Sequence, residues 1–187
     1  MTGEIEQGRL LMKHLCSLWK PCWNYIQMAE LLWEGTPRSI SDSYQVSCRE
    51  KRLVYAEAEG LKQGQWNERL RVTLFPVSQR YRQRTVPEGK RGPSSRWAAL
   101  SAEDIRAHSR ILGDHNLLHR GKDPAAGGFL LFETVRMHCP GHSFCRIRFY
   151  HAVHAAEEFR VVCGEDRMYV YQKQYLCMIV FWKGESL

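Results

Sequence analysis

The residues most capable of chemistry lie together in the segment Gly113–His119, which contains a carboxylate, an amide and an imidazole. Asp114 and His119 are too far apart for one helical turn but close enough to meet across a turn or loop. A carboxylate paired with an imidazole can position a water molecule and move its proton. The same residue types also suit a solvated polar loop, so the short motif alone leaves both interpretations open.

A helix is predicted directly before this segment. Ser101 is a suitable N-cap, and Asp104 stands at the third helical position, as in a capping box. The helix is expected to run to about Leu112, where Gly113 would end it and allow a sharp bend. The acid, amide and imidazole therefore follow the exit of a helix.

This arrangement resembles the motif of the MaoC-like, or type 2 enoyl-CoA hydratase, family of hot-dog proteins. Leu112 and Leu117 depart from the family pattern, which usually has a small residue and a proline there. The resemblance implies an α+β hot-dog fold, in which a curved antiparallel sheet wraps around a long helix. The matching positions are Gly113, Asp114, Asn116, Leu118, His119 and Ala125.

The chain also contains a weak internal repeat, which bears on the fold as a whole. Gly8–Pro21 and Gly127–Pro140 each begin with glycine, end with proline and have an apolar middle. At nearly the same offset, Tyr44–Tyr55 and Phe159–Val170 share aromatic, valine, cysteine, glutamate and arginine positions. Chance could produce two short matches, but a helix followed by strands, repeated once, is the simplest explanation.

Together, the repeat and the resemblance predict a degenerate double hot-dog. The first half begins directly at its helix, so we expect it to lack the opening segment of a complete hot-dog. Both helices are expected to be apolar nearly all round, with Leu11, Leu15 and Leu18 buried on the first. The predicted units are an N-terminal half over residues 1–78, a basic linker over 79–99, and a C-terminal half over 100–187 that carries the motif.

Strand signals follow each predicted helix. The first helix is expected over residues 8–20, where Pro21 stops it, and residues 25–32 are ambiguous between helix and strand. Alternation of apolar and polar residues marks several of the runs as strands with one wet face. The expected strands cover residues 43–48, 53–59, 68–75, 145–149, 159–163, 168–172 and 175–182.

The resemblance also implies a reaction. Asp114 and His119 would hold one water and add it to a 2-enoyl thioester, or remove it from a 3-hydroxyacyl thioester. The thioester would be carried by CoA or acyl carrier protein, and no cofactor is implied. A backbone amide at Gly127 or Gly128 would stabilise charge on the thioester oxygen, and Asn116 would brace the loop or reach the substrate carbonyl.

One departure supports a different class of function. The loop from Ala125 to Gly128 is shorter than the family's, which would misplace the backbone donor. The alternative is a non-catalytic hot-dog that binds an acyl carrier or assembles with a partner. In either case we expect a pseudo-dimer within one chain, or a homodimer.

The net charge of +7 suggests an anionic partner. Arg80 and Arg82 lie in the basic linker and are candidates for a phosphate-binding arm, although a solvated linker is the favoured explanation. Nucleic-acid binding is a further alternative, but no RNA-binding signature accompanies the charge.

A zinc site is a competing interpretation of His138–Cys145, which has two histidines and two cysteines at short spacing, with His151 and His154 nearby. No second Cys-x-x-Cys supports it, so no bound metal is predicted. The seven cysteines show no disulfide framework, and Met1–Gln7 does not resemble a secretory signal. We therefore expect free thiols and a cytoplasmic location, with no membrane span.

Overall fold

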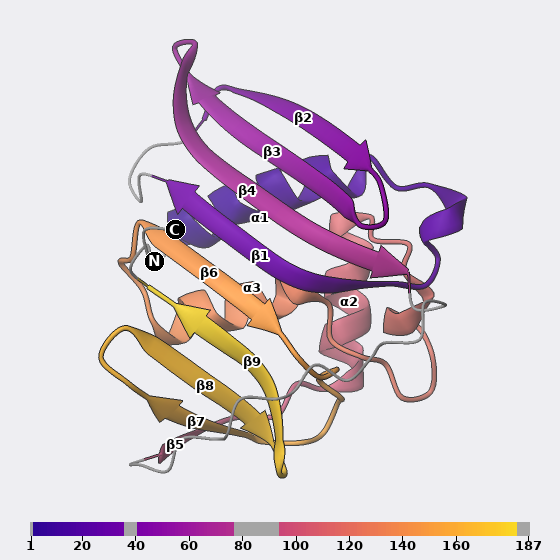
Figure 1. The fold of residues 1–187 in the computed structure, drawn as a ribbon, viewed down its shortest axis with the longest axis vertical. Coiled ribbons are helices and arrows are strands. Elements are labelled where there is room, and N and C mark those ends of the chain that lie inside the picture. Colours follow the sequence, from indigo (N-terminus) through magenta and orange to yellow (C-terminus); the bar gives the residue numbers. More distant parts are fainter. Residues whose placement is uncertain (1, 36–40, 77–93, 183–187) are drawn as a thin grey trace.

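The computed structural model describes residues 2–35, 41–76 and 94–182. Its strands form one nine-stranded antiparallel sheet in the order β2-β3-β4-β1-β6-β9-β8-β7-β5. The helices α1, α2 and α3 lie behind this sheet in Figure 1. The fold is therefore the α+β hot-dog arrangement that the sequence predicts.

The elements follow the chain in two series. The first series is α1 (Thr2–Cys16), η1 (Pro21–Trp23), β1 (Ile26–Gly35), β2 (Ser43–Glu50), β3 (Val54–Lys62) and β4 (Gln65–Pro76). The second is β5 (Ser94–Trp97), α2 (Ala102–Leu112), η2 (Leu117–His119), α3 (Gly128–His138), β6 (Phe144–Phe149), β7 (Phe159–Cys163), β8 (Arg167–Gln172) and β9 (Tyr175–Phe181).

The two halves repeat one topology. Helix α1 precedes strands in the spatial order β1-β4-β3-β2, and α3 precedes strands in the order β6-β9-β8-β7. Cys48 on β2 and Cys163 on β7 therefore occupy equivalent strands, as predicted. A register shift also falls in equivalent places, after Gly60 in the β3–β4 pair and after Val170 in the β8–β9 pair. The halves are thus a double hot-dog within one chain.

Strands β1 and β6 join the halves. They pair antiparallel from Glu30 opposite Arg148 to Glu34 opposite Phe144, so the first half, in indigo and magenta, lies beside the second, in orange and yellow (Figure 1). On the inner face of this joint, Leu31 and Ile147 face each other and are completely buried. One hydrophobic core therefore extends across both halves.

The helices differ in how far they are buried. Residues 129–136 of α3 are all buried, as expected for a helix wrapped by a sheet. The prediction that both helices are apolar all round is wrong for α1, which buries Leu11 and Leu15 but exposes Lys13. The charged side chain of Lys13 explains this, because it keeps one side of the helix in water.

The first helix also ends earlier than predicted. It stops at Cys16 rather than near Lys20, and Leu18 lies half-buried in the following turn. Pro21 begins the short helix η1 instead of ending α1, because a proline ring suits the first position of a helix. The ambiguous segment after it is strand β1.

Charged side chains cover the outer face around the joint. Arg146 and Arg148 both reach Glu30, at 2.9 and 3.1 Å. Arg71 lies 2.8 Å from Glu34, and Arg69 pairs with Glu59. Much of the positive charge on this face is therefore balanced locally rather than presented as a basic patch.

The described residues bear on the predicted basic linker and on the expected absence of a membrane span. Most of the predicted linker, with Arg80 and Arg82, lies outside the described residues, and its last part, Ser94–Trp97, forms the outermost strand β5. Within residues 2–35, 41–76 and 94–182, no helix is long and apolar enough to cross a membrane.

The joint provides a test of the strand register. Leu31→Ala should lower the free energy of unfolding by about 2–5 kcal/mol, because it opens a cavity in the shared core. Its neighbour Leu32 is half-buried on the other face of β1, so Leu32→Ala should cost less than half as much. Urea unfolding of both variants measures this. Equal losses would contradict the pairing of Leu31 with Ile147 on the inner face.

Candidate active site

The loop that carries Asp114 and His119 begins where α2 ends. Ser101 and Asp104 form the predicted capping box, and Gly113 ends the helix at φ 71° and ψ 27°, in the left-handed region that favours glycine. The chain then turns back on the helix, because the Asp114 N–H donates to Ser109 O at 2.9 Å and Ser109 Oγ donates to Asp114 O at 2.8 Å. These bonds fix the backbone of Asp114.

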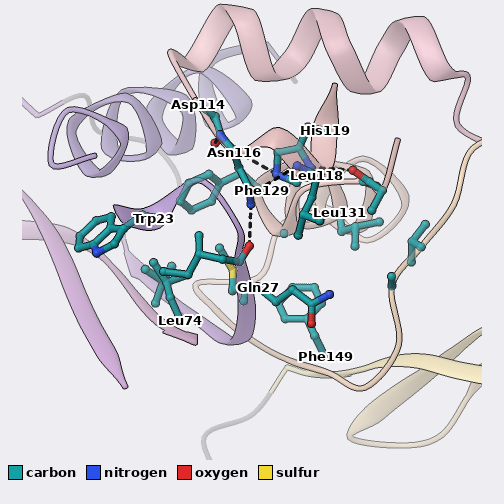
Figure 2. Close-up of a pocket in the computed structure, with 18 of the residues that line it drawn as sticks. Trp23, Gln27, Leu74, Asp114, Asn116, Leu118, His119, Phe129, Leu131 and Phe149 are labelled. Carbon is teal, nitrogen blue, oxygen red and sulfur yellow. Dashed lines mark hydrogen bonds and ion pairs between the residues drawn. The ribbon is translucent and has the colours of Figure 1, made fainter. Parts of the chain in front are cut away.

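Asp114 and His119 meet as the sequence predicts. His119 Nε2 lies 3.3 Å from Asp114 Oδ2, and both side chains are largely buried (Figure 2). The other ring nitrogen, Nδ1, lies 2.7 Å from the carbonyl oxygen of Ala125. Since a carbonyl can only accept, Nδ1 carries a hydrogen and Nε2 is the atom that can exchange a proton beside Asp114.

The carboxyl of Asp114 is held in its ionised form. Burial raises its pKa more than any other single cause, but the hydrogen bond and charge of His119 act in the opposite direction. The Asn116 N–H, which donates to Asp114 Oδ1 at 2.9 Å, adds to this. Together with the charge of His108, these contacts leave the pKa of Asp114 below its ordinary value.

Asn116 braces the loop with both ends of its side chain. Its Nδ2 donates to Ile26 O of β1 at 2.6 Å, and its Oδ1 accepts from the Leu118 N–H at 3.2 Å. Nearby, the Leu117 N–H donates to Asn24 O. The loop from the second half is therefore tied to the start of β1 in the first half, and both polar ends of the Asn116 amide already have protein partners.

The start of α3 lies beside His119 despite the short loop before it. A Cβ added to Gly127 would stand 3.2 Å from His119 Nε2, so a larger residue would push against the imidazole. Gly128 and Phe129 line the same cavity as His119. Backbone N–H groups in the first turn of a helix have no acceptor within the helix, so they are available as donors.

Met28 of β1 crowds this helix start from the other side. A Cβ added to Gly128 would stand 2.5 Å from Met28 Sδ. Strand β1 is irregular here, since its pairing with β4 shifts register between Met28 and Glu30. Only glycine therefore fits at position 128 with Met28 in this place.

The site opens into a cavity of about 320 Å³ between the halves. Figure 2 shows Asp114, Asn116 and His119 lining one cavity together with Trp23 and Leu74 of the first half. Its surface is mainly apolar away from the Asp114–His119 pair. The first half contributes Trp19, Trp23, Ile26, Met28 and Leu74, and the second contributes Phe129, Leu131, Phe149 and Val153.

The structure thus gathers five of the predicted site residues, namely Asp114, Asn116, His119, Gly127 and Gly128. Arg80 and Arg82 lie outside the described residues. Sequence reasoning missed Met28 and the wall from the first half. The internal repeat indicated that two halves would meet, but no spacing or motif marks which of their side chains face the cavity.

In the segment His138–Cys145, which was considered as a zinc site, the side chains make other contacts. His138 stacks on Trp97 at 4.2 Å between ring centroids, and His142 stacks on Trp182 at 4.5 Å. Cys145 is completely buried in the core. Among the described residues, no group of three or more histidine, cysteine, aspartate or glutamate side chains is placed to hold a metal ion.

Comparison with known proteins found structural but not sequence relatives. No protein-family model matches the chain, and a search of curated proteins found no match. HtdX from Mycobacterium tuberculosis is similar in structure, with a TM-score of 0.66 and 15% identity over 95% of this chain and 86% of that one. A MaoC-like dehydratase from Phytophthora capsici gives a TM-score of 0.57 and 14% identity over 91% and 75%.

The fold is not restricted to dehydratases. An acyl-ACP thioesterase from Bacteroides thetaiotaomicron gives a TM-score of 0.54 at 10% identity, over 83% of this chain and 74% of that one. At such identities the likeness establishes the fold. The chain therefore has the hot-dog fold of the MaoC-like dehydratases, as its sequence motif predicts, and acyl-ACP thioesterases share that fold.

Proposed function

We propose that the protein is an enoyl-thioester hydratase or 3-hydroxyacyl-thioester dehydratase. The observation that carries this is the buried Asp114–His119 pair, 3.3 Å apart, beside the first turn of α3 in an apolar cavity. The substrate is a thioester of CoA or of acyl carrier protein. The likeness in fold to MaoC-like dehydratases supports the same assignment.

The reaction needs a positioned water and a place for negative charge. Asp114 Oδ2 and His119 Nε2 bind one water, and the pair takes a proton from it as its oxygen bonds to C3 of the enoyl group. The electron pair of the double bond moves towards the carbonyl, so charge develops on the thioester oxygen. The proton held by the pair then passes to C2. Dehydration is the reverse sequence.

The start of α3 is suited to the developing charge. Its first-turn N–H groups lack intrahelical acceptors, and the helix dipole favours an anion at this end. Gly128 and Phe129 line the cavity on the same side as His119. A thioester carbonyl placed against this turn would accept from backbone amides while C3 lies next to the water.

The apolar wall suits the acyl chain. Trp23 and Leu74 come from the first half, and Phe149 and Val153 from the second. Burial of methylene groups against such a wall is favourable by about 0.8 kcal/mol each. The first half therefore serves the reaction as a chain-binding surface, whereas the acid and the imidazole both come from the second.

The close approach of Met28 to the start of α3 supports a second candidate, which is a non-catalytic hot-dog protein that binds an acyl carrier or a partner. Met28 lies against Gly128, at the place where a thioester oxygen would approach the helix. In that case the cavity would bind an acyl thioester without converting it. Turnover separates the two candidates, because a binder leaves both the enoyl group and the thioester bond unchanged. The same assay would identify a thioesterase, which would release free thiol.

Loss of either member of the pair tests the assignment. Asp114→Asn and His119→Ala should each lower kcat/KM for hydration of crotonyl-CoA or a longer enoyl-CoA by about 10²- to 10⁴-fold. Loss of the enoyl absorbance measures the rate, with free thiol followed in parallel.

The chain offers a matched control for these variants. Asp123 and His154 form another aspartate–histidine pair at 3.2 Å, but with side chains 73% and 45% exposed. Asp123→Asn should therefore leave hydration unchanged. Full activity in both site variants would show that the assigned residues do not perform the reaction.

A second prediction concerns pH. Because the pKa of Asp114 is lower in the folded protein than its ordinary value of about 3.9, its ionised form stabilises the fold above that value. This contribution is lost as the pH falls through the folded pKa. The difference in unfolding free energy between the wild type and Asp114→Asn should thus be largest near neutral pH and shrink below about pH 4.

Urea unfolding of both proteins at a series of pH values measures this difference. A difference that grows on acidification would mean that Asp114 is not held as the carboxylate.

A further inference from the structure

A single buried carboxylate connects the three helices behind the site. Glu133 of α3 is only 4% exposed. Its Oε1 and Oε2 accept hydrogen bonds from Arg9 Nε and Nη2 of α1, both at 2.8 Å. From the third helix, α2, His108 Nε2 lies 3.2 Å from Glu133 Oε1. A buried charge is costly unless it is paired, so these contacts keep the three helices in one arrangement.

The carboxyl of Glu133 is ionised in this environment. Burial raises its pKa more than any other single cause, but the hydrogen bonds from Arg9, together with the charges of Arg9 and of the nearby His108, leave the pKa below the ordinary value. The pair with Arg9 is bidentate, which fixes the orientation of the carboxylate as well as its position. Glu133 is therefore a rigid anion among the helices.

The same contact reaches Asp114 through α2. His108 is followed by Ser109, whose hydroxyl donates to Asp114 O and whose carbonyl accepts from the Asp114 N–H. Both residues are buried. The turn of α2 that meets Glu133 on one side thus holds the backbone of Asp114 on the other.

Glu133 is also linked to the opposite side of the site. It belongs to α3, whose first residues Gly128 and Phe129 line the cavity. The contact between Glu133 and His108 therefore sets how the exit of α2 lies relative to the start of α3. In the proposed reaction, this is the spacing between the pair that moves the proton and the amides that receive the carbonyl charge.

Charged groups from α1, α3 and the loop after α2 lie around His108. Glu133 faces it from α3, with Arg9 of α1 beyond, and Asp114 lies on the loop that follows α2. Cys16 of α1 is also near Asp114, but burial raises its pKa far above the usual value and keeps it a neutral thiol. The charge of His108 is among the causes that lower the pKa of Asp114.

We propose that Glu133, acting through His108, is a positioning residue for the Asp114–His119 pair. It touches no substrate, and it holds the carboxylate and the start of α3 at their working separation. This inference rests on the proposed hydratase function, but its effect on Asp114 can be measured without turnover.

The kinetic test compares Glu133→Gln and His108→Gln with a matched control. Glu30 is also a carboxylate paired with two basic side chains, here Arg146 and Arg148, but it lies on the outer face of the sheet. Both helix-junction variants should lower kcat for enoyl-CoA hydration by about tenfold to a hundredfold, since a small displacement of reacting groups has effects of this size. Their KM should change little, and Glu30→Gln should keep the wild-type kcat.

The second readout is the titration of Asp114, followed by carbon NMR of labelled carboxylates and assigned with Asp114→Asn. His108→Gln removes a charge that lowers the pKa of Asp114, so its titration should move to higher pH. The acidic limb of the pH–rate profile should move in the same direction. A purely structural role for the junction would lower stability without these shifts.

The outcomes separate the two proposals. If the wild type hydrates no enoyl thioester, the proposed function fails, and the Asp114 titration in folded Glu133→Gln still decides the positioning role. Loss of the Glu133 charge alone would lower the pKa of Asp114, so a shift to higher pH shows that Asp114 has moved away from His119. If Glu133→Gln does not fold, His108→Gln provides both readouts. Folded variants with wild-type kcat and an unchanged Asp114 titration would overturn the inference, as would an equal loss of kcat in Glu30→Gln.

Discussion

The antiparallel pairing of β1 with β6 is the interaction on which the rest of the structure depends. It joins the four strands of the first half to the five strands of the second in one sheet, and it brings Leu31 and Ile147 into a shared core. The cavity exists because of this joint, since its walls come from strands and helices on both sides. A single half would expose that apolar surface to water, which is unfavourable in proportion to its area.

The two halves contribute different kinds of side chain to the cavity. The second half carries Asp114 and His119, and a short loop braced by Asn116 holds them against the start of β1. The first half provides bulky apolar side chains such as Trp23 and Leu74 on the facing wall. An apolar surrounding strengthens the electrostatic interaction between the acid and the imidazole, because little water is present to screen it.

The sequence predicted the fold and the proximity of Asp114 to His119, because both have local signals. The capping box at Ser101, the glycine exit at Gly113 and the period-two alternation of β4 each act over a few residues. The end of α1, the placement of Met28 and the role of Glu133 were not predictable in this way. They depend on contacts between elements far apart in the chain, such as Arg9 with Glu133, which leave no periodic trace.

The shared cavity also links ligand occupancy to the thermodynamics of the whole chain. A molecule bound there contacts residues of both halves, and the β1–β6 joint makes those halves one continuous sheet. Binding to the folded state alone shifts the unfolding equilibrium by mass action, by about 2.7 kcal/mol when the free ligand is at a hundred times its Kd. A bound thioester would therefore protect α1 and β2 from unfolding as much as it protects the loop that holds Asp114.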